Sequence, residues 1–121
     1  MTGFLCVGAG GAVGAMFRYA ISLIPYKGTF PVLTFITNVL GALAIGWISG
    51  MAARRGVPDG MVLFLKTGVC GGFTTFSTFS LESYTLLGHG QYGTALLYMI
   101  LSAAVCLAGV AAGIYLAEHI G

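Results

Sequence analysis

The densest group of hydrogen-bonding side chains in the sequence lies in residues 71–80, which read GGFTTFSTFS. Apolar sequence flanks this stretch, yet it carries hydroxyls at Thr74, Thr75, Ser77, Thr78 and Ser80 and rings at Phe73, Phe76 and Phe79. Thr74, Ser77 and Thr78 have the spacing that places side chains on one face of a helix, and the phenylalanines recur every third residue beside them. Hydroxyl donors and the electropositive edges of aromatic rings attract a small anion, and neither carries a fixed charge that would hold the ion too tightly to conduct. The spacing therefore predicts a path for a small anion.

Two glycines, Gly71 and Gly72, open the same stretch and predict a break in the helix there. In a membrane, the backbone groups that a break frees must be satisfied by protein or by water, so a break is tolerated where it is buried or lines a cavity. Carbonyl oxygens exposed at the break would be ligands for a hard cation, and a second break from an antiparallel partner would complete a symmetric oxygen cage. The competing interpretation is an intact, packed helix whose hydroxyls bond back to the preceding turn.

Further polar side chains occur inside the other apolar segments. Asn38 offers an amide donor, and Tyr98 and Ser102 are four residues apart, on one face of a helix. Glu82 and Arg18 would each cost about 2.5–3.5 kcal/mol near the centre of a bilayer. Both are therefore expected to be functional or paired, unless Arg18 snorkels to the interface and Glu82 lies near the end of its segment.

The composition indicates that membrane helices position these residues. Of the 121 residues, 58% are hydrophobic and 7% are charged, whereas a soluble domain has about 25% charged residues. The net charge of +2 is not clustered on a basic face, which excludes a nucleic-acid surface. The sequence has no nucleophile–base pair, carboxylate pair or metal-ligand cluster, so we do not expect an enzyme.

Turn and loop residues divide the chain into four apolar segments of spanning length, so we predict one all-α integral membrane domain over residues 1–121. The predicted transmembrane helices are residues 3–24, 31–53, 58–87 and 92–116, with the third helix broken mid-membrane. The N-terminus lacks a basic region before its apolar run, so we expect the first span to be retained and not cleaved as a signal peptide.

The basic residues do not fix how the chain is inserted. One side of the predicted domain carries Arg54 and Arg55, with Lys66 if it reaches back to the interface, and the other carries Lys27, with Arg18 if it snorkels. Because Lys and Arg set the orientation of membrane helices, this near balance predicts dual topology and an antiparallel homodimer.

Each predicted span also contains two glycines four residues apart, a spacing that lets helix backbones approach closely. The pairs are Gly10/Gly14, Gly46/Gly50, Gly68/Gly72 and Gly109/Gly113. They predict tight helix packing, either within one chain or between subunits.

Over essentially its whole length the chain resembles the Fluc-type (CrcB) fluoride channels. The resemblance rests on GGAVGAMFRY at residues 10–19, on Thr34 and Asn38 of TFITN, and on GGFTTFSTFSLE at residues 71–82, while the match at Tyr98 and Ser102 is looser. One departure is Leu33-Thr34-Phe35, where the family usually has Gly-Thr-Leu. The bulkier Leu33 is expected to alter the entrance to the pore.

The resemblance implies a small protein of the bacterial plasma membrane that exports fluoride passively, prevents its toxic accumulation in the cytoplasm and assembles as an antiparallel dual-topology dimer. It implies a phenylalanine box beside each of two pores, at Phe76 and Phe79, and a pore asparagine at Asn38. The other implied pore residues are Thr34, Ser77, Thr78, Ser80, Tyr98 and Ser102, with Glu82 near one pore end and Arg18 as a vestibule cation. A structural sodium ion (Na+) is implied at the dimer interface, held by the backbone carbonyls of Gly71 and Thr74 from both subunits.

Two other functions stay open on sequence grounds. A small dual-topology, proton-coupled efflux transporter has the same size, span count and weak orientation bias, but such exporters depend on a glutamate in their first span and this one has none. Glu82 would then have to carry the proton coupling. A non-transporting assembly subunit would explain the glycine pairs but not the row of hydroxyls.

Overall fold

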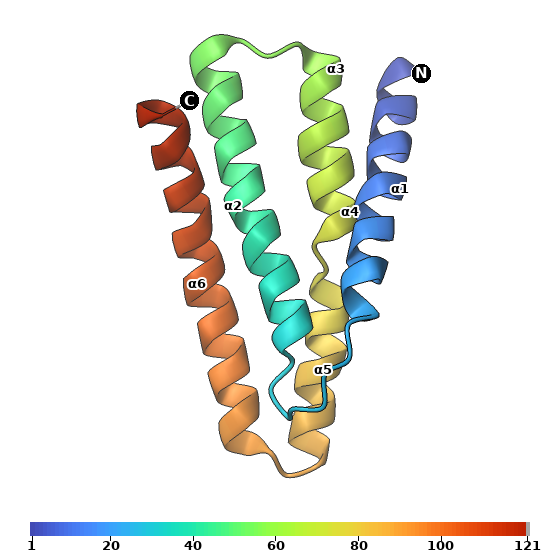
Figure 1. The fold of residues 1–121 in the computed structure, drawn as a ribbon, viewed down its shortest axis with the longest axis vertical. Coiled ribbons are helices and arrows are strands. Elements are labelled where there is room, and N and C mark those ends of the chain that lie inside the picture. The colour runs from blue at the N-terminus through green and yellow to red at the C-terminus, as the bar shows by residue number, and fades with distance from the viewer. Residues whose placement is uncertain (121) are drawn as a thin grey trace.

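The computed structural model describes residues 1–120, and these contain helices and connecting loops without any strand. In chain order the elements are α1 (Thr2–Ser22), α2 (Val32–Arg55), α3 (Asp59–Val62), the π-helix η1 (Leu63–Cys70), α4 (Gly71–Phe73), α5 (Phe76–Gly88) and α6 (Tyr92–His119). They form an elongated bundle in which α3, η1, α4 and α5 follow one another along a single path (Figure 1). The N-terminus, the end of α6 and the α2–α3 connection lie at the same end of the bundle (Figure 1).

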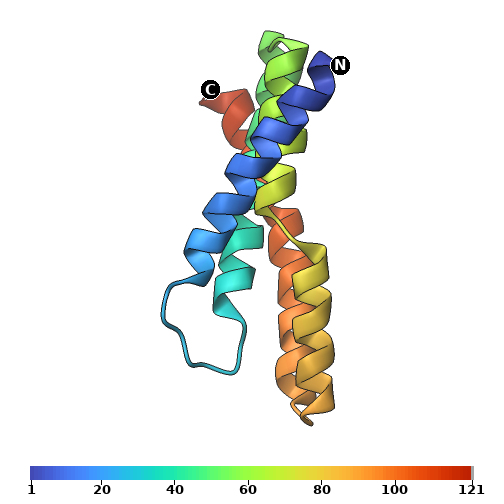
Figure 2. The same cartoon turned by 90° about the vertical axis from the view of Figure 1, so that its right-hand side faces the viewer.

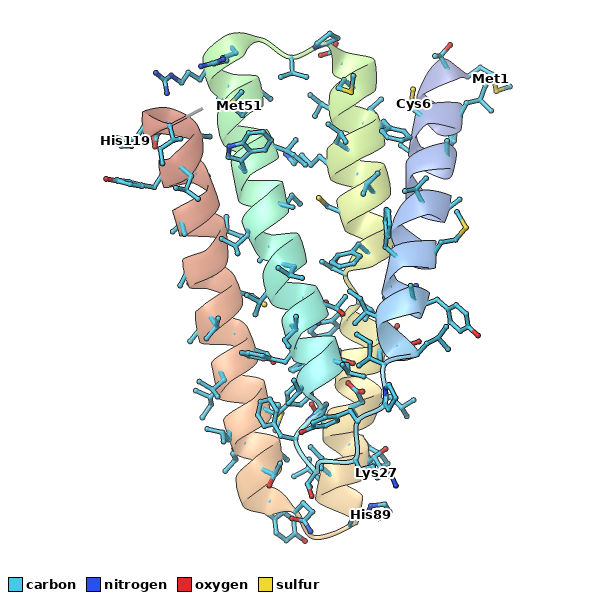
Figure 3. All side chains as sticks on the ribbon, in the orientation of Figure 1. Met1, Cys6, Lys27, Met51, His89 and His119 are labelled. Atoms are coloured by element: carbon cyan, nitrogen blue, oxygen red, sulfur yellow. The ribbon has the colours of Figure 1, made fainter. Side chains whose placement is uncertain are left out.

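Three helices, α1, α2 and α6, are long and apolar enough to cross a membrane. They correspond to the predicted spans 3–24, 31–53 and 92–116. The predicted span 58–87 corresponds to a run of helical pieces from Asp59 to Gly88, none of which is long enough alone. Figure 3 shows that side chains cover the outside of the bundle on all helices, and many of the large exposed ones are apolar, such as Phe4 and Leu107. An apolar outer surface of this kind suits a lipid environment.

The glycine pairs of α1 and of the segmented path bring these two elements into backbone contact. A Cβ atom at Gly10 would collide with the carbonyl oxygen of Phe64, and one at Gly72 would lie 2.5 Å from the carbonyl oxygen of Gly11. No side chain larger than hydrogen fits at these positions, because the obstructing atoms belong to backbone that cannot turn away.

The other two glycine pairs serve a second contact, between α2 and α6. A Cβ atom at Gly46 would collide with the backbone of Val110, and one at Gly113 would collide with the backbone of Leu43 and Trp47. The sequence left open whether the glycines pack helices within or between subunits. The structure shows that all four pairs lie at helix contacts within one chain.

The helical hydrogen bonding of the segmented path is interrupted at Thr74 and Thr75. Their backbone angles are extended, with φ −83° and ψ 158° at Thr74 and φ −150° and ψ 120° at Thr75. Figure 2 shows this extended link as the thin connection between α4 and α5, where the path turns away from α1. The break predicted at Gly71 and Gly72 is therefore wrong in position, since Gly71 is helical (φ −62°, ψ −37°). Gly72 instead provides a close contact with α1 at Gly11.

Candidate functional site

Asn38, on α2, holds the interrupted backbone with both ends of its carboxamide. Its Nδ2 donates to the carbonyl oxygen of Thr75 at 3.1 Å, and its Oδ1 accepts from the N–H of Thr75 at 2.8 Å. Buried backbone groups need partners, most of all where no water replaces them. The Asn38 side chain therefore supplies the two hydrogen bonds that the extended residue no longer receives from a helix.

Thr75 is also the N-cap of α5. Its hydroxyl oxygen accepts from the N–H of Thr78 at 3.1 Å, which satisfies one of the free donors at the start of a helix. The same hydroxyl lies 3.1 Å from the hydroxyl oxygen of Thr78 and 3.3 Å from that of Ser77. Thr75 was not among the predicted site residues. A threonine directly before an apolar helical run is a capping signal that could have identified it.

The predicted row of hydroxyls at Thr74, Ser77 and Thr78 is wrong in its first member. The Thr74 hydroxyl turns back and donates to the carbonyl of Cys70 at 2.9 Å, because Thr74 is the C-cap residue of α4, where the break begins. The cluster consists instead of Thr75, Ser77 and Thr78. Ser80 donates to the carbonyl of Phe76 at 2.9 Å, so the back-bonded arrangement of a packed helix does hold for Thr74 and Ser80.

Two of the three phenylalanines stay together after the break. The ring centroids of Phe76 and Phe79, both on α5, are 5.6 Å apart with an interplanar angle of 40°. Phe76 is 78% exposed in the single chain, whereas Phe79 packs against the ring of Tyr98 at 5.0 Å. Phe73 belongs to α4, on the other side of the break, so the predicted ridge of three rings is a pair.

Glu82 has two hydroxyl donors from two other helices. The Thr34 hydroxyl on α2 donates to its Oε2 at 3.0 Å, and the Tyr98 hydroxyl on α6 donates to its Oε1 at 2.8 Å. The structure thus gives Glu82 two side-chain partners, while its depth in the membrane stays a prediction. No local pattern indicates these partners, which lie 48 and 16 residues away along the chain.

Arg18 is likewise bonded and does not simply extend to an interface. Its Nε donates to the carbonyl of Gly72 at 3.0 Å, which ties α1 to α4 just before the break. The Arg18 side chain also lines a cavity of about 200 Å³, together with Thr34, Thr75 and Thr78. One cationic side chain and several hydroxyl donors thus line the same cavity, an arrangement that can attract an anion.

Three cavities share residues around the break. The first, about 380 Å³, is lined by both rings of the phenylalanine pair and by Asn38, Thr75 and Ser102. Thr75 also lines the 200 Å³ cavity beside Arg18, and Thr34 lines both that cavity and a third one, of about 380 Å³, that contains Glu82. The cavities therefore adjoin one another at Thr75 and Thr34.

The remaining predicted residues divide between these cavities and their surroundings. Ser102 is buried, and its hydroxyl has no hydrogen-bond partner among the described residues, so it retains a free donor at the first cavity. Tyr98 is fully buried behind Phe79 and lines none of the three cavities. Ser77 and Ser80 are exposed on the outer face of α5 in the single chain. Leu33 lines the second and third cavities beside Thr34, which is where its bulk would matter.

At the break, the carbonyls of Gly71 and Thr74 lose their usual helical donors to side chains. In a continuous α-helix the N–H of Thr75 would bond to the carbonyl of Gly71, and the N–H of Thr78 to that of Thr74. Both N–H groups are directed to side chains instead, to Asn38 and to the Thr75 hydroxyl. Carbonyl oxygens are suitable ligands for a hard cation. The described residues contain no cluster of three or more His, Cys, Asp or Glu side chains that could hold a metal.

The chain is similar in sequence to known proteins over almost its whole length. The model of the family described as "CrcB-like protein, Camphor Resistance (CrcB)" matches residues 5–114. A fluoride-specific ion channel FluC of Methylobacterium sp. (strain 4-46) is 43% identical over 124 residues, covering 100% of both chains. The FluC of Roseobacter denitrificans is 42% identical and covers 99% of this chain and 98% of its own, and that of Rhodopseudomonas palustris (strain BisB5) is 45% identical and covers 97% and 98%.

Proposed function

The chain belongs to the CrcB family, and from this premise we propose that it is a fluoride channel of the bacterial plasma membrane through which fluoride leaves the cytoplasm passively. The relatives that match over the whole length are named fluoride-specific ion channels. The observation that carries the proposal is the break held by Asn38 and Thr75, which places free donors and aromatic rings around one cavity.

The chemistry of this cavity suits a small, strongly hydrogen-bonding anion. Asn38 uses one amide hydrogen on Thr75, and its second remains available, as does the hydroxyl of Ser102. The edges of Phe76 and Phe79 add electropositive contacts. These groups replace the water shell of fluoride with uncharged donors, so that the ion binds well enough to enter and weakly enough to leave.

The segmented path of α3, η1, α4 and α5 supports an arrangement with four membrane spans. We infer that the segmented run from Asp59 to Gly88 crosses the membrane as a third helix broken mid-membrane, between α2 and α6. An even number of crossings agrees with both chain ends lying at one end of the bundle (Figure 1). Residues of the opposite end, Lys27 and His89, lie far from Met1 and His119 (Figure 3).

An antiparallel homodimer is supported by the balance of basic residues and by Phe76. Lys27 lies at one end of the bundle (Figure 3), and Arg54, in the last turn of α2, donates to the carbonyl of Ala117 near the end of α6, at the other end. Since neither end has a marked excess, either orientation is accessible. The 78% exposed ring of Phe76 borders the first cavity, so a second copy would close the side of the ion route that one chain leaves uncovered.

A structural sodium ion would fit the carbonyls of Gly71 and Thr74. Both have lost their helical donors to side chains, and Gly71 is exposed in the single chain. Two copies would bring four carbonyl oxygens together. Sodium would neutralise the negative ends of these carbonyl dipoles at the subunit contact.

The alternatives have less support. A proton-coupled exporter would need Glu82 as its proton site, and the names of the relatives give no support to that activity. Both Glu82 oxygens already accept hydroxyl hydrogen bonds, as expected of a structural acid. An assembly subunit without transport would not need the free donor of Ser102.

The test is fluoride efflux from liposomes that contain the purified protein, followed with a fluoride electrode beside a chloride control. We expect rapid fluoride efflux and far slower chloride efflux without any proton gradient. Liposomes that stay impermeable to fluoride would contradict the channel function. Efflux that requires a pH gradient and is lost in Glu82→Gln would favour the exporter.

A further inference from the structure

We propose that Asn38 and Thr75 are positioning residues for the cation site at the break, in addition to any contact that they make with fluoride. In this view each side chain keeps one carbonyl out of the helical hydrogen-bond pattern, so that the carbonyl is available to sodium. The inference rests on the proposed sodium site and extends it to residues that touch no cation themselves.

Asn38 keeps the carbonyl of Gly71 free of its helical hydrogen bond. The N–H of Thr75 is the group that would return to this carbonyl if the helix were continuous. The Oδ1 atom of Asn38 holds that N–H at 2.8 Å, and the Nδ2 atom of the same side chain holds the Thr75 carbonyl at 3.1 Å. Because both bonds come from one planar amide, they fix the extended conformation of Thr75 as a unit.

The hydroxyl of Thr75 keeps the carbonyl of Thr74 free of its helical hydrogen bond in the same way. The N–H of Thr78 would bond to Thr74 in a continuous helix, and it bonds to the Thr75 hydroxyl at 3.1 Å instead. Asn38 and Thr75 thus act on different carbonyls, each four residues before the N–H donor that is diverted from it.

Other side chains bond to further carbonyls at the break, which leaves fewer carbonyls available to a cation. The carbonyl of Cys70 accepts from the Thr74 hydroxyl at 2.9 Å, that of Gly72 accepts from Arg18 at 3.0 Å, and that of Thr75 accepts from Asn38. Side chains therefore take these three carbonyls, whereas Gly71 and Thr74, the two positions of the proposed site, have only lost their donors. A carbonyl without a donor is unfavourable in a membrane, and a bound cation would relieve that cost at these two positions.

Sodium binding and the break are consequently two parts of one equilibrium. A cation that binds only the interrupted backbone stabilises it, and groups that hold the backbone open must raise the affinity for the cation by the same coupling free energy. Loss of either side chain would allow the N–H groups to return to the carbonyls and compete with sodium.

The experiment measures how the thermal stability of the purified protein depends on sodium concentration, with N-methylglucamine replacing sodium at constant ionic strength. In Asn38→Leu and in Thr75→Val we expect the sodium concentration for half-maximal stabilisation to rise about tenfold, which corresponds to the loss of one or two hydrogen bonds. Thr75→Ser keeps the hydroxyl and should retain the wild-type dependence. Thr85→Val is the matched control, because the Thr85 hydroxyl only bonds back to Leu81 within α5.

The outcomes separate this inference from the channel function. A lower melting temperature with an unchanged sodium dependence in Asn38→Leu and Thr75→Val would overturn the positioning role and show a merely structural one. If Asn38→Leu does not fold, Thr75→Val and Thr75→Ser decide the question alone, and an equal sodium dependence in both overturns the proposal. A wild-type protein that conducts fluoride but shows no sodium dependence would contradict the sodium site and leave the channel intact.

Discussion

Tyr98 donates a hydrogen bond from its hydroxyl to the Glu82 carboxylate across the α5–α6 hairpin, with 2.8 Å between the two oxygens. The Tyr98 side chain is fully buried, and its ring centroid lies 5.0 Å from that of Phe79. The carboxylate therefore fixes the residue against which the Phe79 ring packs. This contact connects the acid of α5 to the position of one of the two rings at the proposed ion route.

Replacing Tyr98 with Phe is expected to lower the free energy of unfolding by about 1.5–3 kcal/mol, because the partly buried Glu82 carboxylate would lose one of its two hydroxyl donors. Reversible denaturation of the purified protein in a detergent titration measures the change. Tyr84→Phe is the control, since Tyr84 is 75% exposed on α5, the helix of Glu82, and its substitution should change stability little. Equal effects of the two substitutions would contradict a structural role for the hydrogen bond.

Phe76→Ile and Phe79→Ile are expected to slow fluoride efflux about tenfold while the dimer persists. Isoleucine fills similar space but has no electropositive ring edge, a contribution of about 0.5–1.5 kcal/mol. Liposome efflux and size-exclusion chromatography measure the two properties. Phe4→Ile, at an exposed ring of α1 outside the three cavities, should leave efflux unchanged. Wild-type rates in both pore variants would remove the rings from the mechanism.

Ser102→Ala is expected to reduce fluoride efflux without reducing stability. The Ser102 hydroxyl is buried without a partner among the described residues, so its removal relieves an unsatisfied polar group. Ser83→Ala is a matched buried serine on α5 whose hydroxyl bonds to Phe79, and it should cost about 0.5–1.5 kcal/mol of stability instead. The same assay pair, efflux and denaturation, measures both variants. A marked loss of stability in Ser102→Ala would show that its hydroxyl has a partner in the protein.

Gly10→Ala is expected to destabilise the protein by about 1–3 kcal/mol or to prevent its folding, because the new methyl group would collide with the backbone at Phe64 and Gly68. Gly8→Ala, on the same helix, meets no atom within 4 Å and should be neutral or slightly stabilising. Yield and thermal stability of the two purified variants measure the difference. Equal stability would mean that α1 and η1 can separate without cost.

Local patterns predicted the helices well and the break less well. The apolar segments and the turn residues between them gave α1, α2 and α6 within three residues at each end. The glycines at 71 and 72 suggested a break, yet Gly72 instead makes a close contact with Gly11 of α1, which no local pattern reveals. The extended residues occur at Thr74 and Thr75 because Asn38 is available there to take the backbone groups.

The sequence by itself determined that this is a membrane protein of the CrcB type, because composition and apolar segment length decide the solvent, and the hydroxyl and phenylalanine stretch is specific to the family. Only the tertiary structure decided which atoms complete the site. Asn38 and Thr75 are 37 residues apart, and Thr34 and Glu82 are 48 apart. Hydrogen bonds of this kind depend on distances of about 3 Å between different helices, and spacing within one helix contains no information about them.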